Sequence, residues 1–276
     1  VLRALQQRND LQTADIDDVI WGTSAQKGLQ GGDMGRMAAL DAGYDIRVSG
    51  VTLDRFCGSG LTAVSFAAAQ LKSGMEDLVV AGGTEMTSQI ALMQQQEAAA
   101  GLKSVGLGTG NARLQARYPQ SHQGVSADAI ASMEKIGRDA LDAFGVESQR
   151  RAAHAIQNGY FSRSLVPVFD EGGALLLDKD EYPRPDTTLE GLAALKPAFA
   201  QFADMPLDAR GTTFRKLINQ VHPQIDIQPV HHAGTSSGNV DGAAALLLAS
   251  ERYAREHGFR ARARVVATAN IGDDPT

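Results

Sequence analysis

The sequence predicts an α/β fold, because three neighbouring segments follow the order strand, helix, strand. Residues 48–53 read as a strand, and residues 78–81 form an apolar run that ends at two glycines, as buried parallel strands often do. Between them, four small or apolar residues recur three or four positions apart: Leu61, Val64, Ala68 and Leu71. That spacing predicts an amphipathic helix over 61–71 and completes a βαβ unit.

Similar signals predict the elements before this unit. Residues 1–8 are expected to be the end of a helix, and residues 15–22 a turn followed by a strand. A glycine-rich segment opens another helix at residue 31, which runs to about Ala42 and stops at Gly43.

The elements after the unit are less regular. Residues 89–122 lose clear periodicity, and glycines at 106, 108 and 110 indicate a loop. A helical face follows, formed by Leu141, Phe144, Ser148, Ala152 and Ala155. Gly145 lies inside that run and counts against one unbroken helix. Residues 241–250 fit a helix or a strand, residues 262–267 predict a strand, and we expect Asp241 to cap a helix after Gly238.

Composition argues against several classes of protein. The chain has 276 residues with 26 Lys and Arg against 32 Asp and Glu, so no broad basic surface is available to nucleic acid. No apolar run reaches the roughly 20 residues that a membrane-spanning helix needs. The single cysteine excludes an internal disulfide and is typical of a reducing compartment, so we expect a cytoplasmic protein.

Cys57, the only cysteine, lies where the first strand of the unit gives way to the helix. A thiol at the first turn of a helix faces unpaired N–H groups and the positive end of the helix dipole, which favour the nucleophilic thiolate. A lone cysteine is otherwise most often a small buried hydrophobic residue. Gly58 and Gly60 remove side chains beside the sulfur and let a substrate approach, so we favour the nucleophile.

The motifs around Cys57 resemble those of the thiolase family, the acetyl-CoA C-acyltransferases. Three segments carry this resemblance in the family's order and spacing: Asp54–Leu61, Gly74–Asp77 and Ala81–Met86. Further segments are similar along nearly the whole chain: His122–Val125, Ser148–Ala152, Gly159–Val168, Asp180–Arg184, Thr187–Leu189, Leu195–Phe199 and Ala233–Ala244. The resemblance implies a thiolase-like fold, with an N-terminal α/β half (1–87 and 240–276) and an inserted loop domain (88–239) over the acyl-CoA site.

The resemblance also implies an activity. Cys57 would attack an acyl-CoA or 3-ketoacyl-CoA to form an acyl-enzyme, which is passed to coenzyme A in thiolysis or to acetyl-CoA in condensation. Acyl-CoA and coenzyme A are then substrates, no cofactor is permanently bound, no metal is needed, and a homodimer or homotetramer is expected.

The binding residues implied by the resemblance lie between residues 122 and 237: His122, Gln123, Arg184, Phe199, Ala233 and Ser237. Ala233 and Ser237 match the loop that binds the pantetheine amides, and Phe199 matches a residue that packs on the pantetheine. Arg184 matches a contact near the nucleotide, where the planar donors of arginine suit a phosphate.

The chain departs from the family pattern at several positions. Gln123 stands where many members have Met, Thr235 replaces Asn, and Gly191 replaces a Ser that often contacts coenzyme A. Residues 200–230 also contain extra sequence relative to short biosynthetic members. These departures leave the acyl-chain preference open.

Some candidate residues have a second interpretation. Arg184 lies between two prolines and is equally compatible with an ordinary solvated loop arginine. His122 is a candidate base, although a hydrogen-bonded histidine that lines a pocket is the more common case. His231 and His232 do not predict a metal site, because neighbouring residues on a strand point apart and no third ligand has a useful spacing.

The family's Asn-Glu-Ala-Phe, Gly-His-Pro and late Cys-x-Gly motifs, which supply its acid and base groups, do not occur in the sequence. We therefore expect the second α/β half to be missing from this chain, and the 276 residues alone to lack turnover. Three interpretations stay open: a thiolase that continues beyond this chain, a non-catalytic thiolase-like subunit that binds acyl-CoA or acts as a scaffold, and a Cys-dependent α/β-hydrolase-like thioesterase. The order of the motifs favours the first, and Arg55, where a hydrolase elbow has Gly, counts against the last.

Overall fold

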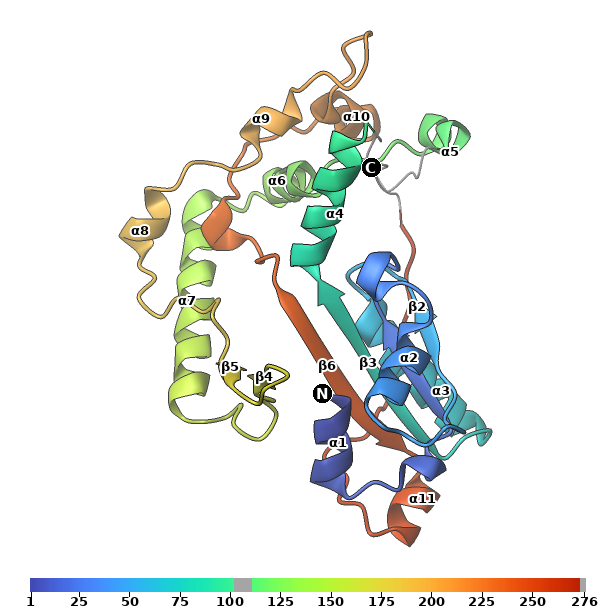
Figure 1. Ribbon diagram of the computed structural model, residues 1–276. Coiled ribbons are helices and arrows are strands. Elements are labelled where there is room, and N and C mark those ends of the chain that lie inside the picture. Colours follow the sequence, from blue (N-terminus) through green and yellow to red (C-terminus); the bar gives the residue numbers. More distant parts are fainter. Residues whose placement is uncertain (102–110, 274–276) are drawn as a thin grey trace. The chain divides into compact units, whose positions relative to one another are not determined.

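A computed structural model describes residues 1–101 and 111–273 (Figure 1). The chain divides into two compact units. Unit 1 contains residues 1–104 and 239–271, and unit 2 contains residues 105–238 and 272–276. The predicted loop segment with glycines at 106, 108 and 110 lies outside the described residues. Within the described ranges, no helix has the length and apolar character needed to cross a membrane.

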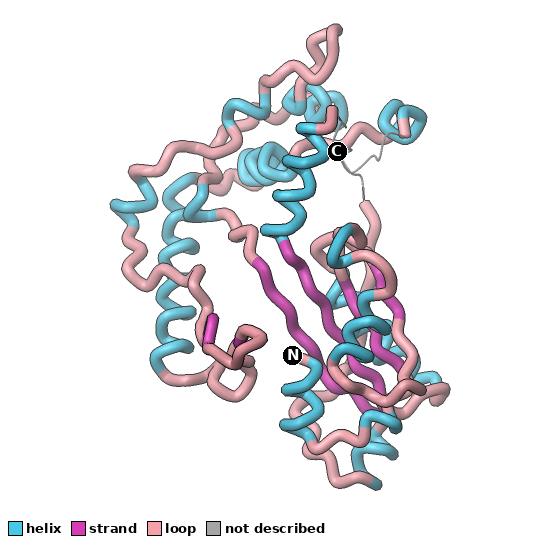
Figure 2. The backbone as a smooth tube through the Cα atoms, viewed as in Figure 1, coloured by secondary structure: helices cyan, strands magenta, loops and turns pink. Residues whose placement is uncertain are grey.

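A four-stranded sheet forms the centre of unit 1 (Figure 2). Its order is β2 (Val51–Leu53), β1 (Asp18–Gly22), β3 (Leu78–Met86) and β6 (Asp241–Ala249). β1 pairs in parallel with both β2 and β3, whereas β6 is antiparallel to β3. The predicted βαβ unit is therefore present, and its two strands lie on either side of β1.

The helices of unit 1 cover both faces of this sheet. Side chains of a strand alternate between its faces, and apolar residues of β1 point to both of them. On one face, Val19 and Trp21 of β1 pack with α1 (Leu2–Asn9) and α2 (Met34–Asp41). On the other face, Ile20 packs with Ala63 and Ala67 of α3 (Ser59–Ser73). The predicted helix at 61–71 is confirmed, but Leu61 is 74% exposed and does not belong to the buried face.

β3 is longer than the sequence predicts. Gly82 and Gly83 were expected to end the strand, yet it continues to Met86. A Cβ atom at Gly82 would lie 2.3 Å from the carbonyl oxygen of Ala244 on β6 and 2.5 Å from the Trp21 ring. The glycine therefore allows close packing inside the sheet and does not mark its edge.

Two predictions about the later part of unit 1 are wrong. Asp241 begins β6 and does not cap a following helix. Its carboxylate accepts hydrogen bonds from Ser88 N and Ser88 Oγ, at 2.9 and 2.6 Å, and so caps the start of α4 (Thr87–Ala99). Residues 262–267 form no strand, because this segment runs along α3, where Lys72 Nζ donates to the Val266 carbonyl. The helix α11 (Glu251–Glu256) precedes that segment.

Unit 2 consists mainly of helices and one hairpin. Its described elements are α5 (Ala112–Arg117), α6 (Gln123–Met133), α7 (Arg138–Gln157), β4 (Val168–Phe169), β5 (Leu175–Leu177), α8 (Leu189–Ala193), α9 (Ala200–Ala203), α10 (Phe214–Val221) and a 3₁₀ turn, η3 (Ala233–Thr235). Two more 3₁₀ turns, η1 (Thr13–Asp15) and η2 (Gly28–Gln30), belong to unit 1. The core of unit 2 joins α6, α9 and α10 through Val125, Ala129, Ala203, Ile218, Ile225 and Ile227. Residues 89–122 show no clear periodicity in the sequence, but they contain α5 and most of α4.

α7 runs unbroken through Gly145, contrary to the sequence expectation. A Cβ at Gly145 would meet the Leu192 side chain at 3.2 Å and the Gly234 carbonyl oxygen at 3.3 Å. The glycine thus brings α8 and η3 close to α7. The buried face of α7 is also shifted from the predicted one, because Asp142 and Gly145 are buried while Phe144 is 74% exposed.

Candidate active site

Cys57 is exposed in a tight turn between β2 and α3. Phe56 has a φ angle of 47°, in the left-handed region that is uncommon for residues other than glycine. Ser59 maintains the turn, because its Oγ donates to the Phe56 carbonyl at 2.6 Å and accepts from Arg55 N at 2.8 Å. Cys57 lies one residue before Gly58, the N-cap of α3, and so just outside the first turn in which it was predicted.

The two glycines after Cys57 differ in their surroundings, since a Cβ at Gly58 would lie 3.3 Å from the Arg55 carbonyl oxygen. A Cβ at Gly60 would meet no atom within 4 Å, so this glycine is not required by packing and the surface beside the turn is open. Gly22 at the end of β1 is required, because a Cβ there would lie 2.5 Å from the Ser59 carbonyl carbon. The backbone of the first turn of α3 thus rests directly on the sheet.

Glu85, at the end of β3, is the centre of a polar network in unit 1. Its carboxylate accepts hydrogen bonds from Ser24 N at 2.9 Å, Ser24 Oγ at 2.6 Å and Gln30 Nε2 at 2.8 Å. Gln30 is buried and also accepts from Met86 N. Burial acts to raise the pKa of Glu85, but the hydrogen bonds from Ser24 and Gln30 outweigh it and lower the pKa.

His122 lies in an aromatic cluster of unit 2. It is the N-cap of α6, and its Nδ1 accepts from Gly124 N at 3.1 Å. Its ring is stacked on Phe202 at a centroid distance of 4.8 Å and is tilted against Phe199 and Phe214 at 5.6 and 5.9 Å. The structure therefore brings together two of the predicted binding residues, His122 and Phe199.

Gln123 and Phe199 are positioned by the start of α6. Gln123 is the first residue of this helix and is exposed. Gly124 follows it, and a Cβ there would lie 2.3 Å from the Phe199 ring, so only glycine allows that ring its present place. Ala198 N donates to the His231 carbonyl at 2.9 Å, which joins the Phe199 segment to the segment that contains Ala233.

The Ala233–Ser237 segment is preceded by two histidines that bind separate aspartates. His231 Nδ1 lies 2.8 Å from Asp128 Oδ1 on α6, and His232 Nε2 lies 2.6 Å from Asp142 Oδ1 on α7. The two rings thus bind different aspartates, although His231 and His232 do not lie on a strand as the prediction assumed. Ala233 and Ser237 themselves are exposed.

Arg184 and Ser237 are connected through a tyrosine. The guanidinium carbon of Arg184 lies 5.4 Å from the centroid of the Tyr182 ring, a geometry in which the cation is attracted to the ring face. A Cβ at Gly238 would lie 2.2 Å from the same ring, so Tyr182 packs on the backbone beside Ser237. Arg184 is exposed, and its N–H donates to Gln149 Oε1.

The seven predicted site residues fall into both units: Cys57 belongs to unit 1 and the other six to unit 2. Sequence reasoning missed Asp128 and Asp142, which are 2% and 3% exposed. No signal in the sequence marks them, because the buried faces of α6 and α7 are known only from the fold and the histidine partners lie 103 and 90 positions away.

Comparison with known proteins places this architecture in a family. The family description "Thiolase, N-terminal domain" matches residues 1–203. A beta-ketoadipyl-CoA thiolase of Acinetobacter baylyi is 34% identical over 99% of this chain and 65% of its own length. A 3-oxoadipyl-CoA/3-oxo-5,6-dehydrosuberyl-CoA thiolase of Escherichia coli K12 is 36% identical with the same coverage. A 3-ketoacyl-CoA thiolase of Psychrobacter cryohalolentis is 34% identical over 99% of this chain and 62% of its own length.

These matches show an α/β protein with a thiolase N-terminal domain, as the fold class predicted from the sequence implies. The chain belongs to the thiolase family. It spans less than two thirds of the length of the curated relatives that it matches.

Proposed function

We propose that the complete protein containing this chain is an acyl-CoA acyltransferase of the thiolase type, with Cys57 as its nucleophile. The observation that carries the proposal is the exposed Cys57 in a turn with the left-handed Phe56, in a chain of this family. A substrate can reach the exposed sulfur, and the Ser59 hydroxyl fixes the backbone of Arg55 and Phe56 just before it. The names of the relatives suggest a 3-ketoacyl-CoA as the substrate.

In thiolysis, the Cys57 thiolate attacks the C3 carbonyl carbon of the 3-ketoacyl-CoA. The new carbon–sulfur bond forms as the C2–C3 bond breaks, and the electron pair leaves with the acetyl-CoA enolate, which then takes up a proton. Coenzyme A attacks the acyl-cysteine thioester, releasing a shortened acyl-CoA and restoring Cys57. Condensation is the same sequence in reverse. We place the acid and base groups for these steps in the part of the relatives that this chain does not span.

The proposed coenzyme A site lies in residues 88–239, the proposed loop domain. The six residues assigned to it are His122, Gln123, Arg184, Phe199, Ala233 and Ser237. Two contacts support this assignment: Phe199 packs against His122, and Tyr182 lies between Arg184 and the backbone beside Ser237. We further propose a cytoplasmic homodimer or homotetramer without a permanently bound cofactor.

The nucleophile can be tested by mass spectrometry of the complete protein after incubation with acetyl-CoA. We expect one acetyl group on the intact protein and on the peptide that contains Cys57, and no such adduct in Cys57→Ser. An undiminished adduct in Cys57→Ser would refute the assignment. An unmodified wild-type protein that still binds coenzyme A would favour a non-catalytic thiolase-like subunit.

The assignment of Arg184 can be tested by calorimetry. Arg184→Ala should weaken coenzyme A binding about tenfold, which is the effect of losing one charge-assisted hydrogen bond. The matched control is Arg163→Ala, another arginine of unit 2 that has no assigned role in the site. Equal affinities for the wild type and Arg184→Ala would make Arg184 a solvated loop residue.

A further inference from the structure

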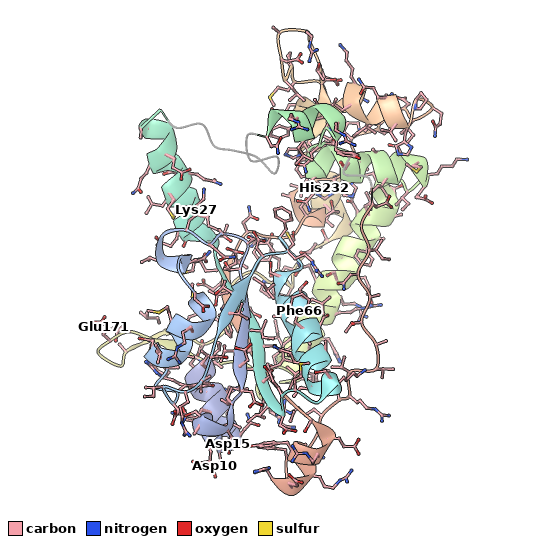
Figure 3. The ribbon with its side chains drawn as sticks, turned by 90° about the vertical axis from the view of Figure 1, so that its right-hand side faces the viewer. Asp10, Asp15, Lys27, Phe66, Glu171 and His232 are labelled. Atoms are coloured by element: carbon pink, nitrogen blue, oxygen red, sulfur yellow. The ribbon has the colours of Figure 1, made fainter. Side chains whose placement is uncertain are left out.

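The segment proposed to bind the pantetheine arm is attached to the core of unit 2 by a buried polar chain. Arg138 Nε donates to both oxygens of Asp142 at 3.0 Å, and Asp142 Oδ1 lies 2.6 Å from His232 Nε2. Figure 3 labels His232. Its side chain is 0% exposed, and Asp142 is 3% exposed. At the other side of the His232 ring, Nδ1 accepts from Gly234 N at 3.1 Å.

These contacts define the protonation of the His232 ring. Because Nδ1 accepts the Gly234 N–H, it carries no proton, and the neutral ring has its proton on Nε2, where it donates to Asp142. Burial acts to raise the pKa of Asp142, but the hydrogen bonds from His232 and Arg138 outweigh it and lower the pKa, so the carboxylate remains an acceptor. Arg138 also donates to the Leu192 and Leu195 carbonyls at 2.6 and 2.9 Å, which ties the chain to α8.

The turn that follows His232 is further restrained by close packing and by two more hydrogen bonds. A Cβ at Gly234 would lie 2.4 Å from the Leu192 side chain, so the turn is packed closely against α8. Thr235 Oγ1 accepts from His232 N at 3.1 Å, and Ser236 Oγ donates to the His232 carbonyl at 2.9 Å. These hydrogen bonds to the ring and backbone of His232 therefore set the direction in which the chain continues toward Ser237.

We propose that His232 is a positioning residue for segment 233–237 through the hydrogen bond from the Gly234 N–H to its Nδ1, while Asp142 and Arg138 stabilise the buried ring and fix its Nε2–H tautomer. This inference rests on the proposed role of Ala233 and Ser237 in binding the pantetheine arm. His232 is fully buried, so it acts through the loop backbone. Its contact with Gly234 preorganises the loop, so that binding costs less ordering of the chain.

Two substitutions each preserve one hydrogen bond of the His232 ring and remove the other. In His232→Asn, the side-chain oxygen replaces Nδ1 as acceptor for Gly234, but the side chain is too short to reach Asp142. In His232→Gln, the terminal amide replaces Nε2 as donor to Asp142, but nothing accepts from Gly234. His257→Gln is the matched control, because His257 is exposed and lies in unit 1.

The test measures coenzyme A affinity by calorimetry and the midpoint of thermal unfolding on the complete protein. We expect His232→Gln to weaken binding about tenfold while keeping the higher midpoint of the two variants. We expect His232→Asn to bind within about threefold of wild type while having the lower midpoint, since Asp142 loses a buried partner. The control should leave the coenzyme A affinity unchanged.

A role in stability alone predicts a different result, in which affinity and midpoint fall together in both variants, and that result would overturn the inference. Nitrogen-15 spectra of histidine-labelled wild-type protein supply a second measurement, since they should show a protonated Nε2 and an unprotonated Nδ1 for His232. A protonated Nδ1 would also overturn it. Failure of the wild type to bind coenzyme A would reject the proposed function itself, and the inference with it.

Discussion

Replacing Asp128 with alanine should strongly destabilise the protein, because one of its oxygens accepts three hydrogen bonds from residues 230–231. Asp128 Oδ1 accepts from Val230 N at 3.0 Å, from His231 N at 2.9 Å and from His231 Nδ1 at 2.8 Å. The carboxylate is 2% exposed, so water cannot replace it without rearrangement of α6 and the segment. Each donor left without a partner costs about 1–3 kcal/mol.

Summed over two backbone donors and one ring donor, and reduced because the segment can relax toward solvent, the expected loss for Asp128→Ala is about 3–5 kcal/mol. That is a large share of the roughly 5–15 kcal/mol by which a folded protein is stable. Asp128→Asn keeps an oxygen acceptor at the same place and should lose only about 1–2 kcal/mol.

Urea unfolding of the complete protein, followed by far-ultraviolet circular dichroism, measures these differences. The matched control is Asp186→Ala, an exposed aspartate of unit 2, which should change the free energy of unfolding by less than about 0.5 kcal/mol. If the free energies of unfolding of Asp128→Ala and this control differ by less than about 1 kcal/mol, the three hydrogen bonds do not stabilise residues 230–231 as we argue.

Two further predictions concern other positions. Gly124→Ala should displace the Phe199 ring, which lies 2.3 Å from the added Cβ, and should weaken coenzyme A binding measured by calorimetry, whereas Gly137→Ala, which adds a Cβ in open space, should not. The pKa of Glu85 is lowered in the folded protein, so its contribution to stability is complete above the unfolded pKa of roughly 4.3 and disappears as the pH falls through the folded value. The unfolding midpoint of Glu85→Gln should therefore lie below that of wild type at pH 7 and approach it at pH 3, and a difference independent of pH would contradict this.

Much of unit 1 could be predicted from local pattern. The βαβ order, the helix start near Cys57 and the strand at 78–81 all follow from apolar spacing and glycine position. The errors came from contacts between distant residues. Gly82 was expected to end a strand, but Trp21 and Ala244 pack against it from neighbouring strands. Asp241 was expected to cap a following helix, but it caps α4, which begins 154 residues earlier at Thr87.

The candidate site was predicted unevenly for a similar reason. Cys57 is distinctive by itself, as the only thiol between a strand and a helix. Asp128 and Asp142 are ordinary acidic residues of helices in the sequence, and they became important only when His231 and His232 were brought to them from about 90 to 100 positions away. No local pattern encodes such a pairing.

The sequence by itself determined the family and the βαβ unit around Cys57, because these depend on short segments whose spacing is read directly. Only the tertiary structure decided which carboxylates are buried, which glycines are required by packing, and how His232 holds the turn before Ser237. Burial and hydrogen bonding are properties of pairs of segments, and the free energy of each buried charge depends on the partner that the fold brings to it.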